Sequence, residues 1–137
     1  MEIVTNRPYE HGFWLAEKTG CDRLHGWCQY IGLEKDGEIV AVCGYDDFNI
    51  SSVRAHIAIE GRINKRFLWF ILHYPFEQLK VKKMVAPVHS GNAKSLRFCE
   101  KLGFVKEAIV KDMFADGDLY FLTMTKNQSK MLSIGQP

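Results

Sequence analysis

The sequence lacks the features that mark several common protein classes. Its four cysteines, Cys21, Cys28, Cys43 and Cys99, include no C-x-x-C pair, so their spacing predicts neither a zinc ribbon nor a redox dithiol. No stretch reaches about 18 consecutive apolar residues, so no transmembrane helix is expected. The N-terminus has no long apolar run after a basic start, so no signal peptide is expected either. Together these absences predict a cytoplasmic protein whose thiols are reduced.

Charge of one sign is also scarce, because 18 Lys and Arg residues face 16 Asp and Glu residues, for a net charge of +2. Bulk charge therefore gives no reason to expect nucleic-acid binding. The 137 residues are 47% hydrophobic and 12% aromatic, which is enough for one packed core. We expect a single domain over residues 1–126, followed by a polar tail over 127–137 that frays.

Hydrophobic periodicity and turn residues predict alternating helices and strands. Helices are expected over residues 8–19, 64–79 and 92–103, hairpins over 27–48 and 104–126, and single strands over 51–61 and 82–88. The first helix should turn Phe13, Leu15 and Ala16 inward, and Pro75 should kink or interrupt the second. The first hairpin turns at Asp36-Gly37. This order predicts a mixed α/β (α+β) fold, with helices packed on a central sheet.

The strand over 51–61 and the turn after it are the first candidate for chemistry. Alternation places Val53, Ala55, Ile57 and Ile59 on one face and Arg54, His56, Ala58 and Glu60 on the other. Arg62, Lys65 and Arg66 then crowd the start of a helix, where free N–H groups and the helix dipole favour an anion. A bound polyphosphate would stabilise that arrangement; a solvated basic turn is the alternative interpretation.

The segment "NAKSLRFCEKLGF", residues 92–104, is predicted to be a helix capped by Asn92 and ended by Gly103. Asn92, Ser95 and then Gly103-Phe104 resemble the N-x-x-(A/S)…G-F segment of the GNAT N-acetyltransferase superfamily. The order of elements is similar over about residues 30–126. "HYPFEQL" and "DGDLYFL" resemble in particular a subgroup of short GNAT proteins found in phages and bacteria.

That resemblance implies a largely antiparallel central sheet with helices on both faces and a splayed pair of parallel strands, here "RAHIAIE" and "KKMVAPV". It implies acetyl-CoA as co-substrate between these strands; no metal is expected. The pantetheine arm would contact the backbone at Ile57, Ala58 and Ile59. The pyrophosphate would lie on Arg62, Ile63, Asn64, Lys65, Arg66 and Phe67. The helix that carries Asn92, Ser95 and Phe98 would cover the other side of the cofactor.

The chain departs from the family pattern at two points. The usual loop, (Q/R)-x-x-G-x-(G/A), has glycine or a small residue where this chain has Lys65 and Phe67. Lysine and arginine side chains could partly replace the missing backbone contacts to phosphate. The second departure is Cys99, where the family often has the tyrosine that protonates the leaving CoA thiolate. Cys99 is either that general acid or a small core residue.

Acetyl transfer also needs a base that removes a proton from the amine. His56 is the first choice, because histidine titrates near neutral pH and its strand meets the cofactor. Glu60 shares that strand face, but could instead pair with Arg62 or a neighbouring lysine. His89 is a further candidate, and Asp46 and Asp47 could hold a cationic substrate. The other histidines, His11, His25 and His73, have no partner at metal-ligand spacing.

The sequence therefore predicts an acetyl-CoA-dependent N-acetyltransferase that acts on a primary amine of a small molecule or protein. It would work away from membranes, in the cytoplasm of the host cell if a phage encodes it. The alternative is a catalytically inactive GNAT-shaped protein that binds a host or virion protein. Nucleic-acid binding through residues 62–66 and 80–83 is a weaker interpretation, because no recognised motif is present. A homodimer is an open possibility.

In folds of this kind the acceptor loops lie in the variable N-terminal third, here residues 8–30. Trp14, Trp27 and Tyr30 could line a pocket there or fill the core, and the core is the usual place for side chains of this size.

Overall fold

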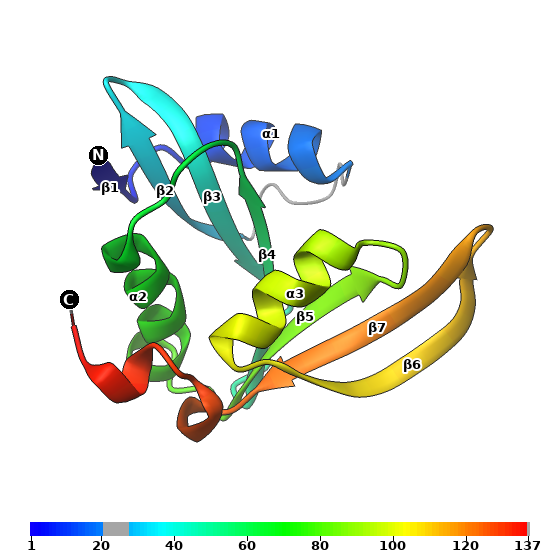
Figure 1. Cartoon of the computed structure of the whole chain (residues 1–137). Coiled ribbons are helices and arrows are strands. Elements are labelled where there is room, and N and C mark those ends of the chain that lie inside the picture. The colour runs from blue at the N-terminus through cyan, green and yellow to red at the C-terminus, as the bar shows by residue number, and fades with distance from the viewer. Residues whose placement is uncertain (21–27, 137) are drawn as a thin grey trace.

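The computed structural model describes residues 1–20 and 28–136, so the predictions for Cys21, His25 and Trp27 lie outside the described residues. The chain forms a seven-stranded sheet in the order β1-β2-β3-β4-β5-β7-β6 (Figure 1). The strands are β1 (Glu2–Val4), β2 (Gln29–Lys35), β3 (Glu38–Asp46), β4 (Ser52–Ile59), β5 (Lys83–His89), β6 (Val105–Phe114) and β7 (Gly117–Met124). The helices are α1 (Pro8–Thr19), α2 (Lys65–His73) and α3 (Ala93–Leu102). No helix in the described part of the chain has both the length and the apolar character needed to span a membrane.

Neighbouring strands of the sheet run antiparallel, except for β4 and β5, which run parallel. This confirms the predicted mixed, largely antiparallel sheet. The β2–β3 hairpin turns at Asp36 and Gly37, whose φ values of 53° and 82° are those that the predicted turn pair requires. The hydrophobic pattern does not predict β1, because three residues are too few to show alternation.

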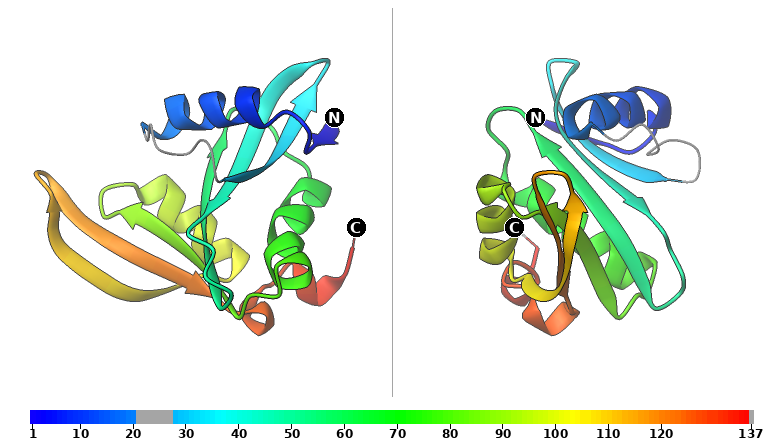
Figure 2. Two further views of the ribbon diagram at one scale, coloured as in Figure 1. Left: turned by 180° about the vertical axis from the view of Figure 1, so that it is seen from behind. Right: turned by 90° about the vertical axis from the view of Figure 1, so that its right-hand side faces the viewer.

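The helices cover both faces of the sheet, as the resemblance implied (Figures 1 and 2). α2 and α3 share one apolar core with the sheet, in which Phe67 and Leu102 are buried. α1 packs on the opposite face, where Leu15 meets Tyr30 in a smaller core. The prediction for Phe13 is wrong, since its side chain is 66% exposed. The buried stripe of α1 instead runs through His11, Gly12 and Leu15.

A buried polar cluster joins the start of α1 to β2. Glu34 accepts two hydrogen bonds from Arg7, at 2.8 and 2.9 Å, and lies 2.7 Å from His11 Nε2. His11 and Glu34 are both buried, so the pairing compensates for their desolvation. His11 is thus a structural residue, in line with its lack of metal-ligand spacing.

Pro75 interrupts α2 as predicted, but the chain continues as a π turn, η1 (Tyr74–Gln78). Proline has no N–H to continue the α-helical ladder, and the wider π turn is closed by the Leu79 N–H, which donates to the Tyr74 carbonyl at 3.3 Å. The turn carries Tyr74 and Phe76 onto the core of the α2 face.

The C-terminal residues, for which fraying is predicted, contact the end of α3 in the structure. Two short 3-10 turns, Lys126–Gln128 and Leu132–Ile134, follow β7. Ser129 is buried, and Met131 packs against the main core. The Lys130 N–H donates to the carbonyl of Leu102 at 3.1 Å. The polar composition suggested fraying, but a few apolar side chains are enough to attach the segment to the end of α3.

Candidate functional site

The strands β4 and β5 separate after a short paired segment. The backbone register joins residues 52–54 to residues 83–85, although β4 continues to Ile59 and β5 continues to His89. Beyond Arg54, β4 stays paired with β3, and β5 stays paired with β7. The facing edges of β4 and β5 are therefore split along this stretch, which is the splayed parallel pair that the resemblance implied.

Hydrogen-bond alternation indicates which backbone groups of β4 face the split. The Glu60 N–H donates to the Val40 carbonyl, on the β3 side, at 2.7 Å. Because successive residues of an antiparallel strand alternate sides, the backbone groups of the odd-numbered residues in Ala55–Ile59 point away from β3. The side chains of His56 and Ala58 lie on the α1 face. Ala58, one of the predicted cofactor residues, therefore turns its backbone toward β3.

The split leads to the start of α2, where the predicted phosphate site lies. The Asn64 side chain caps the helix by accepting a hydrogen bond from the Phe67 N–H at 2.8 Å. Phe67 has a fully buried side chain, so neither part of this residue is free for a ligand. The backbone N–H groups of Lys65 and Arg66 have no helical partner within the described residues. These two side chains and that of Arg62 are exposed and cationic.

The helix α3 lies beside β5 on the same face as α2. The Asn92 side chain caps it by accepting a hydrogen bond from the Ser95 N–H at 3.1 Å. Ser95 and Phe98 are half-buried, and Asn92 is exposed. Cys99 lies inside the core, where burial and the nearby Glu100 raise its pKa to about 11. Its surroundings are those of a packed apolar residue.

His56 belongs to a charged cluster on the α1 face of the sheet. Its Nε2 lies 3.0 Å from Asp46 Oδ1, and Arg54 donates two hydrogen bonds to the same carboxylate, at 2.8 and 2.7 Å. A carboxylate only accepts, so the neutral imidazole carries its proton on Nε2 and leaves Nδ1 as a free acceptor. Among the described residues, Nδ1 has no hydrogen-bond partner.

The cluster also sets the protonation of its members. Burial lowers the pKa of His56 below its ordinary value, and the Asp46 carboxylate opposes this shift only in part. Burial alone would raise the pKa of Asp46, but hydrogen bonds from Arg54 and the proximity of His56 outweigh it and lower that pKa. The result is a neutral imidazole held against an ionised carboxylate, which is an arrangement suited to a general base.

The other predicted bases are already engaged. Glu60 pairs with Lys18 of α1, at 2.6 Å, and not with a cation near it in the sequence. His89 Nε2 lies 2.9 Å from Asp116 Oδ1, and its Nδ1 accepts a hydrogen bond from the Gly91 N–H at 2.8 Å. Neither ring nitrogen of His89 is therefore available to accept a proton from a substrate.

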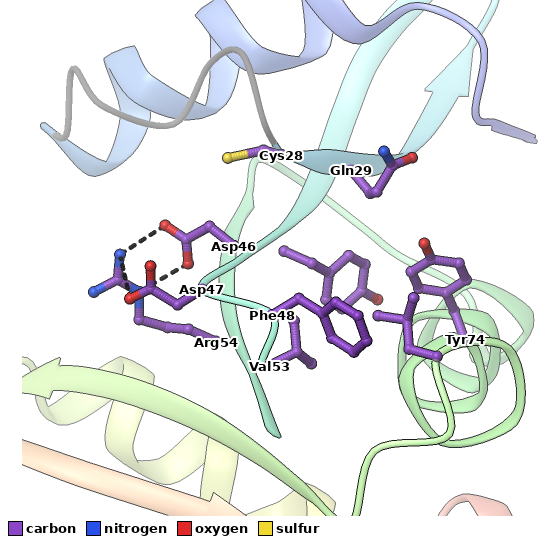
Figure 3. Close-up of a pocket in the computed structure, with 10 residues that line it drawn as sticks. Cys28, Gln29, Asp46, Asp47, Phe48, Val53, Arg54 and Tyr74 are labelled. Atoms are coloured by element: carbon purple, nitrogen blue, oxygen red, sulfur yellow. Dashed lines mark hydrogen bonds and ion pairs between the residues drawn. The ribbon is translucent and has the colours of Figure 1, made fainter. Parts of the chain in front are cut away.

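A cavity of about 700 Å³ lies at the end of β3, next to the His56 cluster (Figure 3). It is lined by Cys28, Gln29, Tyr45, Asp46, Asp47, Phe48, Val53, Arg54, Tyr74 and Leu79. No sequence pattern indicates Phe48 and Tyr74 as site residues, because they lie on a loop and a π turn that are far apart in the chain. Trp14 and Tyr30, which could have lined an acceptor pocket, instead pack in the smaller core.

Comparisons with known proteins identify the fold. No protein-family model matches the sequence, and the comparison with curated proteins found no match. The spermidine N-acetyltransferase SpeG of Vibrio cholerae superposes with a TM-score of 0.73 at 16% identity, over 98% of this chain and 99% of that one. The N-acetyltransferase PseH of Campylobacter jejuni, in complex with acetyl coenzyme A, superposes with a TM-score of 0.59 at 21% identity, over 86% and 79%. YncA of Salmonella typhimurium, with its cofactor acetyl-CoA, superposes with a TM-score of 0.70 at 15% identity, over 90% and 92%.

Sequence identities this low show a shared fold and nothing further. The matched proteins are N-acetyltransferases or hold acetyl-CoA, and each match extends over most of both chains. The mixed sheet with one parallel pair, and helices on both faces, is the architecture that the Asn92–Phe104 segment predicted. This chain therefore has the fold of the GNAT N-acetyltransferases.

Proposed function

We propose that the protein is an acetyl-CoA-dependent N-acetyltransferase that acetylates a primary amine by direct attack. The observation that carries the proposal is the split between β4 and β5, which runs past His56 and ends at the cationic start of α2. PseH and YncA, whose structures hold acetyl-CoA in a similar fold, support the choice of co-substrate.

Acetyl-CoA brings an acetyl group that is already activated as a thioester. The backbone of Ile57 and Ile59 binds the pantetheine amides, much as a further strand would. The N–H groups of Lys65 and Arg66, with their side chains and that of Arg62, bind the pyrophosphate. Asn92, Ser95 and Phe98 line the other side of the cofactor. The cationic side chains thus make part of the phosphate contacts that a glycine loop makes with its backbone N–H groups alone.

His56 acts as the base. Its Nδ1 takes a proton from the ammonium of the acceptor, directly or through one water, and Asp46 stabilises the imidazolium that forms. A backbone N–H on the split edge of β4 donates to the carbonyl oxygen of the thioester. Cys99 needs no part in this chemistry, since its burial suits a packing role and a CoA thiolate is a fair leaving group.

Isothermal titration with acetyl-CoA tests the co-substrate. We expect the double variant Lys65→Glu/Arg66→Glu to bind at least about tenfold more weakly than the wild type, because two cations at the phosphate site are replaced by anions. The matched control is Lys35→Glu/Lys82→Glu, which reverses two exposed cations outside the site. The control should bind within about twofold of the wild type. An absence of binding at millimolar acetyl-CoA would overturn the proposal.

Release of CoA with a panel of primary amines tests the reaction itself. One observation favours the alternative of a GNAT-shaped binding protein: the Phe67 N–H, at a position where the family has a small residue, is occupied by the Asn64 cap. Acetyl-CoA binding without CoA release from any amine would support that alternative. Amine-dependent release of CoA that His56→Gln abolishes would support the enzyme.

A further inference from the structure

The cavity beside His56 is the part of the site to which the proposed function assigns no role. It opens where β3 extends past the first residue of β2, and its volume of about 700 Å³ lies within the range of pockets that hold small ligands. It shares Asp46 with the His56 cluster: Asp46 lines the cavity, and the His56 imidazole, which does not line it, lies 3.0 Å from the Asp46 carboxylate.

One end of the cavity is aromatic and apolar. The ring centroids of Tyr45 and Tyr74 lie 5.1 Å apart, and the Tyr45 O–H donates to the Ile71 carbonyl, which fixes the orientation of that ring. Phe48 is 52% exposed, and Figure 3 shows it on the same side of the cavity as Tyr74. A half-exposed phenyl ring beside two tyrosines loses contact with water when an apolar group binds, which favours such a ligand.

The other end of the cavity is acidic. Arg54 Nη2 lies 2.7 Å from Asp46 Oδ2 and 3.4 Å from Asp47 Oδ2 (Figure 3). Two carboxylates thus share one guanidinium, and burial keeps the neighbouring imidazole of His56 neutral at neutral pH. Among the described residues, the lining therefore carries more negative than positive charge, which attracts a cation and repels an anion.

We infer that this cavity binds the acceptor, and that the acceptor is a primary amine carried on an aromatic or apolar body. The inference rests on the proposed function. The ammonium lies at Asp46 and Asp47, and the body packs against Phe48 and the two tyrosine rings.

The reaction of such an acceptor is balanced. Because the Nε2 edge of His56 faces Asp46, its Nδ1 first takes one proton from the ammonium through a bridging water. The neutral nitrogen then bonds to the carbonyl carbon of the thioester, the C–S bond breaks, and a second proton passes from the nitrogen to the CoA sulfur. The products are the N-acetyl amine and free CoA.

Calorimetric binding to the protein without acetyl-CoA tests the ligand class independently of turnover. The probes are 2-phenylethylamine, ethylamine (which lacks the ring) and 2-phenylethanol (which lacks the charge). We expect 2-phenylethylamine to bind at least about tenfold more tightly than either of the others. Equal binding of ethylamine and 2-phenylethylamine would overturn the inference.

Two variants locate the binding to this cavity. Phe48→Ala should weaken the binding of 2-phenylethylamine by at least about fivefold and leave ethylamine unchanged, because it removes apolar contact area only. Phe13→Ala is the matched control, since Phe13 is a similarly exposed ring on α1 that does not line the cavity, and it should change neither value. An unchanged affinity of Phe48→Ala for 2-phenylethylamine would contradict the inference.

Turnover separates this inference from the proposed function. Faster CoA release with 2-phenylethylamine than with ethylamine or spermidine supports both. Faster release with ethylamine or spermidine overturns the inference and leaves the function in place. Binding in the stated order without CoA release from any amine overturns the proposed function and leaves the ligand class of the cavity supported.

Discussion

At the scale of single residues, the proposed chemistry depends on the hydrogen bonds that hold one imidazole, that of His56. Among the described residues, two histidines lie near the split between β4 and β5, and both contact a carboxylate. The Nδ1 of His89 accepts a hydrogen bond from the Gly91 N–H, whereas the Nδ1 of His56 has no partner among the described residues. The difference between a structural histidine and a candidate base is thus one backbone hydrogen bond.

We expect His56→Gln to lower kcat/KM for CoA release by about 10²–10⁴-fold, the usual contribution of a general base. In the wild type, kcat/KM should fall as the pH drops through the His56 pKa, because only the neutral imidazole accepts a proton. Burial lowers that pKa from its ordinary 6.5, so this acidic limb lies below pH 6.5 and activity is full at neutral pH. A pH profile of thiol release measures both effects. The control is His73→Gln, at a histidine that stacks on Trp69, and it should keep the acidic limb of the pH profile. An acidic limb that persists in His56→Gln would indicate another base.

Cys99 is the residue at which this chain departs most plainly from the GNAT pattern that it resembles, and its role can be tested directly. We expect Cys99→Ala to keep full acetyl transfer, because a thiol whose pKa burial raises to about 11 is a poor proton donor. The same change should lower the free energy of unfolding by about 1 kcal/mol, through lost packing in the core. Urea denaturation and CoA release measure the two effects. A loss of activity without a loss of stability would restore Cys99 as a general acid.

At the scale of elements, the capping residues fix where the helices beside the site begin and end. Asn64 and Asn92 both cap a helix that borders the split, through one side-chain hydrogen bond each. α1 and α3 both end at a glycine in the left-handed region, Gly20 at φ 71° and Gly103 at φ 116°. The two glycines differ in their surroundings, because only Gly103 lies against the C-terminal turn.

That difference predicts unequal costs for the same substitution. Gly20→Ala should lower the free energy of unfolding by about 1 kcal/mol, the cost of a left-handed conformation with a Cβ. Gly103→Ala should cost at least about 3 kcal/mol, because its Cβ would also overlap the carbonyl oxygen of Gln128. Chemical denaturation of both variants measures the two costs. Equal losses would contradict the packing of the C-terminal turn against the end of α3.

At the scale of the whole molecule, the sheet consists of two halves joined at one short parallel segment. Residues 52–54 and 83–85 carry the pairing between β4 and β5, and the shared core of α2 and α3 adds further contact. A ligand that fills the split binds to both halves at once. Cofactor binding should therefore stabilise the molecule as a unit.

Acetyl-CoA at about 100 times its Kd should raise the free energy of unfolding by about 2.7 kcal/mol. For a chain of this length that corresponds to a rise of about 9 °C in Tm. Amide hydrogen exchange should slow at Ile57, Ile59 and the start of α2, whose backbone N–H groups are the proposed contacts of the cofactor. Thermal denaturation with and without acetyl-CoA measures the shift, and Lys65→Glu/Arg66→Glu should lose most of it. A Tm that does not respond would argue against binding in the split.

Local signals in the sequence were sufficient for most elements, because caps, turn pairs and alternation act over a few residues. Asn92, Gly103 and Asp36-Gly37 mark helix and hairpin ends that the structure confirms. The short strand β1 and the packed C-terminal turns were not predictable in this way, since each owes its form to a distant partner. The narrower likeness to short phage and bacterial GNAT proteins stays a prediction.

The sequence by itself determined the architecture, since the order of elements and the Asn92–Phe104 segment together indicated a GNAT fold with a splayed strand pair. Only the tertiary structure decided how the site is arranged. It joined His56 to Asp46 across two strands, paired Glu60 with Lys18 of α1, and brought Phe48 beside Tyr74. The physical reason is range: secondary structure follows from neighbours along the chain, whereas protonation, free hydrogen-bond capacity and cavity shape depend on residues that only folding brings into contact.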